Sequence, residues 1–169
     1  MLTDEIATST TTVTIETLAL RVDLSGSWAY RRLVTTPLPG ESPDQAARRV
    51  SGVSADQTAV TVHSTSWRYE PGGEVVLTYA VCPDPWTHLP AVRLPYMRVA
   101  RGGAPATPSP VDMTVANVVA HGIRHLAYLK VTDPVVRATL EVVPEIAAGL
   151  DKLCPISSLG VTVPQSMFL

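Results

Sequence analysis

The segment that most constrains the fold is residues 58–82, TAVTVHSTSWRYEPGGEVVLTYAVC, because it predicts two strands joined by a tight turn. Both halves are rich in β-branched and aromatic residues, which favour strands. Pro71-Gly72-Gly73 supplies the positive φ angles that a tight reversal needs. Strict alternation would give each strand one face with a set of residues in common. These are Thr61, His63, Thr65, Trp67 and Tyr69 in the first strand, and Val75, Leu77, Tyr79 and Val81 in the second.

Length and composition indicate one globular domain. The chain has 169 residues, of which 46% are hydrophobic, so it can bury one core but is too short for two ordinary domains. The net charge of −2 gives no general attraction to nucleic acid or to an anionic membrane. No stretch has the roughly 20 apolar residues of a membrane span, and the polar residues 1–11 lack the features of a secretory signal. Cys82 and Cys154 form no metal-binding motif. We therefore expect a cytoplasmic protein with no nucleic-acid partner, no membrane partner and no cofactor.

Two strands are indicated before the hairpin. Residues 12–24 alternate between apolar and polar in two registers that change near Glu16-Thr17. This change predicts a bulge or a bend in one long strand. Residues 28–36, WAYRRLVTT, predict a short second strand.

A short helix is expected from Pro43 to about Val50. Ser42 is a good N-cap, proline suits the first helical position, and Gly52 can close the helix.

The strongest helical periodicity lies after the hairpin, where apolar residues recur at steps of three and four from Val115 to Leu129. We expect Asp112 to cap this helix. A second helix is expected to start at Asp133-Pro134, and Pro144 should kink it. Together they predict a pair of helices packed as an αα-hairpin.

Two further segments have no regular pattern. Residues 83–111 are rich in proline, so they are expected to form a long arm that serves as a lid, an interface or a cover for the core. Residues 155–169 form an apolar tail, which would often pack against its own domain or a partner. We therefore expect a polar lead-in at 1–11, a domain at 12–154, the tail, and a homodimer.

Residues 38–49, LPGESPDQAARR, resemble the middle of the Nudix box. That pattern is glycine, five residues, glutamate, seven residues, arginine-glutamate, an apolar residue, any residue, two glutamates, any residue and glycine. With its first glutamate at Glu41, the arginine falls on Arg49. The order of strands and helices over residues 12–130 is also similar to a Nudix fold. The resemblance implies an α/β fold in which a mixed β-sheet has helices on both faces, a Nudix-like α/β/α sandwich. The same residues also suit a helix start on physical grounds alone, without common ancestry.

The rest of the box departs from the Nudix pattern. Thr35 stands in place of the leading glycine, and three glutamates are replaced by Val50, Val53 and Ser54. Asp56 stands in place of the closing glycine. In the family those glutamates bind the divalent ions that hold a pyrophosphate and activate the attacking water. Valine cannot bind a metal ion, so we expect no catalytic residue, no metal ligand and no ordinary Nudix hydrolysis here.

His121 and His125 are four residues apart and therefore leave the same side of the predicted helix. Two such imidazoles can share a transition metal if a third ligand comes from elsewhere, but the glutamate of an HExxH motif is missing. We favour the alternative, in which both are partly buried at the edge of the core.

A ligand platform is the second candidate site. Trp67 or Tyr79 could stack on a flat group while Arg68 or Arg124 meets a negative charge. The alternative is that the aromatic residues form cross-strand core pairs. The candidate ligand-binding residues are thus Trp67, Arg68, Tyr79, His121, Arg124 and His125.

These patterns favour a binding protein for a small anionic or nucleotide-like ligand, or for a protein partner. One alternative is a divergent metal-dependent hydrolase of nucleoside diphosphate derivatives, with Glu41, Asp44 and Asp56 as a rearranged metal site. Another is a structural protein that forms a homo-oligomer.

Overall fold

The computed structural model describes residues 11–105, 110 and 112–153. Its strands and helices, in chain order, are β1 (Thr12–Val22), β2 (Trp28–Thr35), α1 (Pro43–Ser51), β3 (Thr61–Glu70), β4 (Glu74–Cys82), β5 (Val92–Arg93), α2 (Val115–Thr132), α3 (Pro134–Leu140) and α4 (Pro144–Asp151). The predicted lead-in, except Thr11, and the predicted tail lie outside the described residues.

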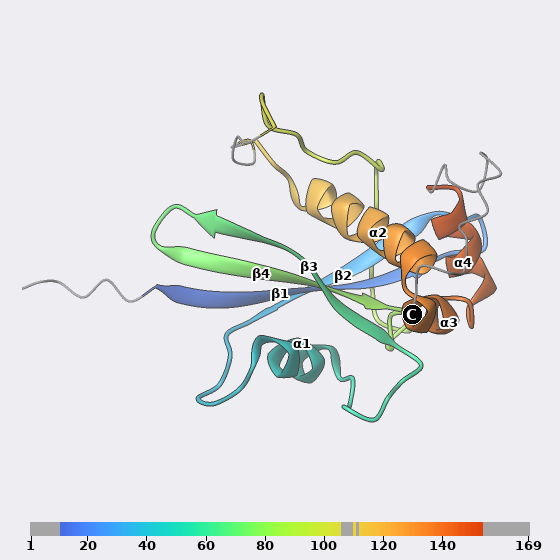
Figure 1. Ribbon diagram of the computed structural model, residues 1–169, viewed down its shortest axis with the longest axis horizontal. Coiled ribbons are helices and arrows are strands. Elements are labelled where there is room, and N and C mark those ends of the chain that lie inside the picture. Colours follow the sequence, from blue (N-terminus) through green and yellow to red (C-terminus); the bar gives the residue numbers. More distant parts are fainter. Residues whose placement is uncertain (1–10, 106–109, 111, 154–169) are drawn as a thin grey trace, which may run out of the picture.

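The strands form one five-stranded mixed sheet in the order β3-β4-β1-β2-β5. The central pair, β1 and β4, is parallel, and the other neighbours are antiparallel. Helix α1 lies against one face of the sheet, and α2 lies against the other (Figure 1). The fold is therefore the mixed α/β fold that the sequence predicts. In the described part of the chain, no helix is long and apolar enough to span a membrane.

Strand β1 is buried on both faces, and this explains its mixed pattern. Ile15 packs with α1, whereas Leu18 and Leu20 belong to the core cluster beneath α2. The pairing of β1 with β2 and β4 continues without interruption. The predicted bulge or bend near Glu16-Thr17 is therefore wrong, because the change of pattern reflects two covered faces.

The bulge lies in β3 instead. Ser64 and Ser66 pair with two adjacent residues of β4, Tyr79 and Thr78, which leaves Thr65 as an extra residue. An extra residue reverses the facing of every side chain beyond it.

This reversal separates residues that strict alternation would place together. His63 lies opposite Ala80, which belongs to the core under α2, whereas Trp67 lies opposite Leu77, which packs towards α1. The prediction of one face carrying both His63 and Trp67 is therefore wrong.

The ends of α1 follow the predicted signals. The Ser42 side chain accepts a hydrogen bond from the backbone N–H of Gln45, and Gly52 closes the helix with a φ of 72°. Helix α2 begins later than predicted, because Thr114 rather than Asp112 is its N-cap. Pro144 does not kink a longer helix but starts a separate one, α4.

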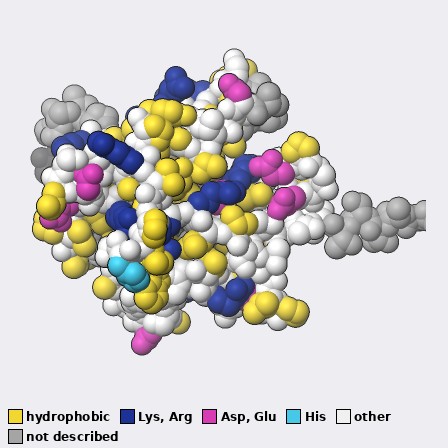
Figure 2. Space-filling model, turned by 180° about the vertical axis from the view of Figure 1, so that it is seen from behind, with side chains coloured by type: hydrophobic (Ala, Val, Ile, Leu, Met, Phe, Trp, Pro, Cys, Tyr) yellow, Lys and Arg dark blue, Asp and Glu magenta, His cyan; other side chains and the backbone are white. Residues whose placement is uncertain are grey.

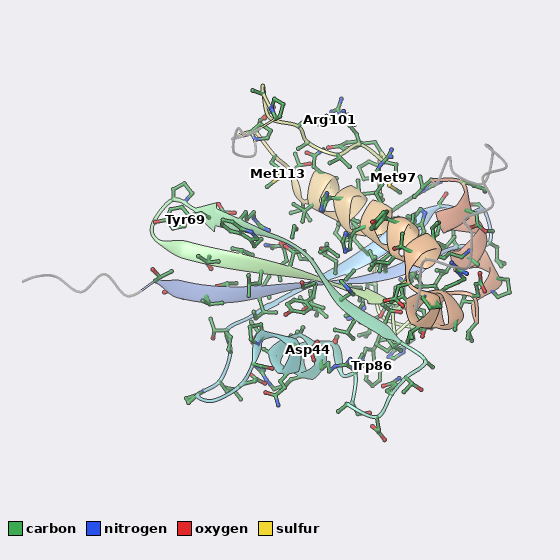
Figure 3. All side chains as sticks on the ribbon, in the orientation of Figure 1. Asp44, Tyr69, Trp86, Met97, Arg101 and Met113 are labelled. Atoms are coloured by element: carbon green, nitrogen blue, oxygen red, sulfur yellow. The ribbon has the colours of Figure 1, made fainter. Side chains whose placement is uncertain are left out.

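The described part of the proline-rich arm covers the sheet edge and α2. Its only regular strand is β5, which pairs with β2. Leu94 and Met97 pack against the core under α2, and Figure 3 shows Met97, Arg101 and Met113 on the α2 side of the sheet. Of the three predicted roles, this part of the arm fulfils that of a cover.

Candidate functional site

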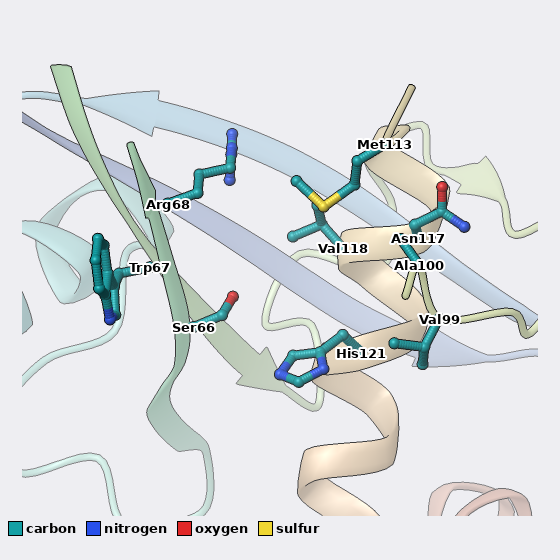
Figure 4. Close-up of a pocket in the computed structure, with 9 residues that line it drawn as sticks. All are labelled: Ser66, Trp67, Arg68, Val99, Ala100, Met113, Asn117, Val118 and His121. Atoms are coloured by element: carbon teal, nitrogen blue, oxygen red, sulfur yellow. The ribbon is translucent and has the colours of Figure 1, made fainter. Parts of the chain in front are cut away.

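A cavity of about 190 Å³ lies between β3 and the first turns of α2, with the arm along its rim. Arg68 and Ser66 come from β3, and Val99 and Ala100 come from the arm (Figure 4). The cavity is lined by Ser66, Trp67, Arg68, Val99, Ala100, Met113, Asn117, Val118 and His121. Of these, Trp67 directs its indole away from the others.

Arg68 is fixed in this cavity wall by a buried carboxylate. Its Nη1 donates to Glu16 Oε2 at 2.7 Å and to Thr78 at 3.2 Å, and its Nη2 donates to Glu16 Oε1 at 3.3 Å. Its Nε donates to Glu70 at 2.7 Å. A guanidinium has five N–H donors, so one remains for a ligand beyond these four bonds.

Glu16 stays ionised despite its burial. Burial alone would raise the pKa of this carboxyl, but hydrogen bonds from Arg68 and Arg32 outweigh that effect and lower the pKa. The resulting ion network joins β1, β2 and β3 beside the cavity.

The first turn of α2 holds the arm in place through a capping box. Thr114 accepts a hydrogen bond from the backbone N–H of Asn117, and the Asn117 side chain donates to the carbonyl of Arg98 at 2.8 Å. Arg124 donates to the carbonyl of Met97 at 3.3 Å. These bonds place the backbone of the arm beside the cavity.

Three histidines lie together next to this cavity, between β3 and α2. The ring centroids of His63 and His125 are 5.3 Å apart, and those of His121 and His125 are 6.4 Å apart. His125 Nε2 is buried and has no hydrogen-bond partner within the described chain. Burial lowers the pKa of His125, and the neighbouring His63 and His121 lower it further.

The predicted ligand-binding residues do not form one site. Arg68 and His121 line the cavity, and His125 lies beyond His121 in the histidine cluster. Tyr79 is buried against α1 on the opposite face of the sheet, where Trp67 is also found. The structure does not bring Trp67 or Tyr79 together with Arg68, because the sheet separates the aromatic rings from this arginine. Arg124, the other arginine of the predicted platform, donates to the carbonyl of Met97.

Several residues of the site were missed from sequence. Asn117 could have been found as the third residue after a threonine cap, and Glu16 as a lone carboxylate within a buried strand pattern. Ser66 and Met113 give no comparable signal.

The region that resembles the Nudix box is held together by arginine-carboxylate pairs. Arg49 binds Glu41 through two bonds of 2.7 and 2.9 Å, and this bidentate pair lowers the pKa of Glu41 to about 2. Arg48 pairs with Asp44 at 3.1 Å. Val53, where the family has a glutamate, is buried in the core beside α1. Within the described ranges, no three His, Cys, Asp or Glu side chains are arranged to hold a metal ion.

Comparison of the chain with protein-family models, with curated proteins and with solved structures gave no match.

Proposed function

We propose that this chain is a Nudix-like protein that binds a small anionic ligand in the cavity between β3 and α2 and does not hydrolyse it. The observation that carries this proposal is the cavity itself, whose wall includes the Arg68 guanidinium and whose arm residues, Val99 and Ala100, lie next to Arg98 and Arg101 in the sequence. A volume of about 190 Å³ is below the usual range of roughly 300–1,000 Å³ for ligand pockets, so it suits a small anion or one part of a nucleotide.

The charge around the cavity favours an anion. The arm residues that line it, Val99 and Ala100, are flanked by the exposed Arg98 and Arg101. Residues 85–111 contain no aspartate or glutamate. The positive charge is local, since acidic and basic side chains are interspersed on the face shown in Figure 2.

The Nudix-like part of the proposal is supported by the order of elements. Two strands lead to the loop and helix that carry Glu41 and Arg49, and a strand pair and a long helix follow, as the resemblance implies. The absence of hydrolysis is supported by the valines at positions 50 and 53 and by the engagement of Glu41 and Asp44 with arginines. These carboxylates hold the loop and helix together and are not grouped around a common point.

A thermal-shift and calorimetry screen tests this proposal. The probes are inorganic phosphate, pyrophosphate, nucleoside monophosphates and nucleoside diphosphate derivatives, each with and without Mg²⁺ or Mn²⁺. We expect at least one probe to stabilise the protein without being consumed. Turnover of any probe would refute the proposal, and so would a screen without a stabilising probe.

Two variants locate the binding site. Ala100→Phe fills the cavity from the arm and should abolish binding of any probe that stabilises the wild type. Trp67→Ala is the matched control, because its indole points away from the cavity, and it should bind as the wild type does. Equal binding by both variants would place the ligand elsewhere.

A second candidate function is self-association through the sheet face on which α1 lies, at the part of that face that α1 does not cover. Trp67 and Tyr69 are 69% and 63% exposed and lie on the edge strand β3. Exposed aromatic residues of this size are enriched at protein interfaces. Light scattering should then show a homodimer in the wild type and a monomer in Trp67→Ala/Tyr69→Ala, whereas a monomeric wild type would rule out this function.

A further inference from the structure

The edge of the sheet at β2 is only partly closed. Strand β2 pairs with β1 along its whole length, from Trp28 to Thr35, whereas on its other side β5 pairs only with Ala29 and Tyr30. We propose that an extended segment of a partner protein adds to the open part of β2 as an antiparallel strand, and that this segment carries an apolar and an acidic residue on one face. The edge shares no lining residue with the cavity between β3 and α2, so binding there is independent of the ligand of that cavity.

The open part of β2 presents unpaired backbone groups. In an antiparallel sheet, the N–H and C=O of one residue point to one neighbouring strand, and those of the next residue point to the other. The carbonyl of Trp28 accepts a hydrogen bond from the N–H of Leu94 at 2.8 Å, so Trp28 and every second residue after it point away from β1. Arg32 and Val34 therefore direct their N–H and C=O groups outwards, where they have no partner among the described residues. The backbone of another extended segment is the natural complement of such groups.

The arm cannot complete this edge itself. If β5 continued in its register, Pro90 would come opposite Arg32, but proline has no N–H to donate. The backbone of Leu89 is engaged elsewhere, since its N–H donates to the carbonyl of Trp86 at 3.0 Å and its carbonyl accepts from Arg21 at 2.9 Å. The arm therefore leaves the edge free for another chain.

An apolar groove of about 550 Å³ lies beside the open edge, between β2 and the arm. Leu89 and Val92 line it from the arm and are 39% and 58% exposed. Tyr30 of β2 and Val115 of α2 also line the groove. Contiguous apolar side chains that remain exposed are typical of interaction sites. An apolar side chain of the added strand would cover them.

Arg32 favours a segment that carries a carboxylate. Its Nε donates to Glu16 at 2.6 Å, while its two Nη groups have no hydrogen-bond partner in the described part of the chain. The side chain lines the groove and is 42% exposed, so these groups can bind a carboxylate through two bonds. Side chains on one face of a strand recur at every second residue. The apolar and the acidic residue of the segment should therefore be two positions apart.

A fluorescein-labelled peptide, KTVTDTVTK-amide, tests the proposal by fluorescence anisotropy with the full chain. The sequence is palindromic, so its aspartate and valines share one face in either direction of binding. We expect saturable binding of one peptide per chain. The peptide KTVTNTVTK-amide, which lacks the carboxylate, should bind about tenfold more weakly, because it loses a charge-assisted pair with Arg32.

Methylated peptides test whether the backbone takes part. In the proposed pairing, the residues opposite Arg32 and Val34 are the aspartate and valines, because they share the face of the Arg32 side chain, and their N–H groups point to β2. N-methylation of these three residues should weaken binding at least about tenfold. N-methylation of three threonines is the matched control and should leave binding unchanged, since those N–H groups point away from β2.

Val34→Pro tests the same pairing from the protein. It removes an outward N–H and leaves the bonds to β1 intact, and proline is tolerated at such edge positions. Binding should weaken at least about tenfold, whereas Val34→Thr, which keeps the N–H, should bind as the wild type does. If circular dichroism shows that Val34→Pro does not fold, Val92→Asp makes the test by placing a carboxylate in the groove against that of the peptide. Val135→Asp is its control, because Val135 is 75% exposed and lies on α3.

Three results would overturn the proposal. The first is no saturable binding of KTVTDTVTK-amide by the wild type. The second is equal binding of the two methylated peptides, or binding that both Val34→Pro and Val92→Asp retain. The third is a wild-type dimer in light scattering that Val34→Pro converts to a monomer, because a second copy of the chain would then occupy the edge.

Discussion

The ion network of Glu16 allows a sharp test of how this sheet is stabilised. The Glu16 side chain is 1% exposed and accepts four hydrogen bonds, two from Arg68, one from Arg32 and one from Thr78. Glu16→Gln keeps the side-chain volume but removes the charge. It also replaces one acceptor oxygen with an NH₂ group, which faces other donors.

The expected loss follows from the exposure of each partner. Removal of one partner of a buried ion pair typically costs about 3–5 kcal/mol. Arg32 is 42% exposed, so water can solvate it, and Arg68 keeps its bond to Glu70. We therefore expect the lower end of the range, about 3 kcal/mol of unfolding free energy.

Glu70→Gln is the matched control because Glu70 binds the same guanidinium at the same distance of 2.7 Å. Glu70 is 39% exposed, and an exposed pair contributes less than about 1 kcal/mol. Urea unfolding of both variants at pH 7 provides the measurement. If Glu16→Gln costs no more than Glu70→Gln, burial does not set the strength of this network.

The pH dependence gives an independent check. The pKa of Glu16 is lowered from 4.5 in the folded chain, because its arginine bonds outweigh burial. The folded state therefore binds this proton less readily than the unfolded state. The stabilisation is complete above pH 4.5 and is lost as the pH falls through the lower folded pKa. The difference in stability between wild type and Glu16→Gln should shrink over that interval.

Three further predictions concern other parts of the fold. Gly52→Ala should lower the free energy of unfolding in urea by about 3 kcal/mol, because a Cβ at this positive φ would lie 2.8 Å from Trp86 Nε1. Gly40→Ala is the control, because φ is also positive there but a Cβ meets nothing within 4 Å, and it should cost about 1 kcal/mol. Lys130→Met should lower the free energy of unfolding by only about 1 kcal/mol, because methionine keeps the buried aliphatic part of the side chain and the lost partners, Glu141 and Asp151, are exposed to water. Hydrogen exchange should locate this loss of stability in α3 and α4. Cys82 should resist iodoacetamide in the native protein and react in urea, because burial raises the pKa of its thiol to about 12. Peptide mass spectrometry measures the labelling of Cys82, and rapid labelling of the native protein would contradict the prediction.

Features with local causes could be predicted from sequence. The limits of α1 depend on Ser42, Pro43 and Gly52, each of which acts on the backbone next to it. The β3-β4 turn depends in the same way on Gly72 and Gly73, which both have positive φ. The start of α2 was predicted two residues early, because Asp112 and Thr114 are both good caps and only the bonds of Asn117 select the second.

Features that depend on distant partners could not be predicted. The bulge at Thr65 is defined by pairing with β4, and a single strand gives no sign of it. Strict alternation therefore placed Trp67 with His63. The mixed pattern of β1 was also misread, because it depends on two helices far away in sequence.

The same bulge makes both halves of the site possible. His63 and Arg68 are five residues apart, so in a regular strand they would lie on opposite faces of the sheet. The extra residue allows His63 to face His125 while Arg68 reaches Glu16 on the same side. Deletion of Thr65 would force a choice between these two contacts. Because the buried charge of Glu16 is costly to leave unpaired, the Arg68 contact should persist and His63 should turn away from α2. The contact between the His63 and His125 rings would then be lost while the wall of the cavity remains.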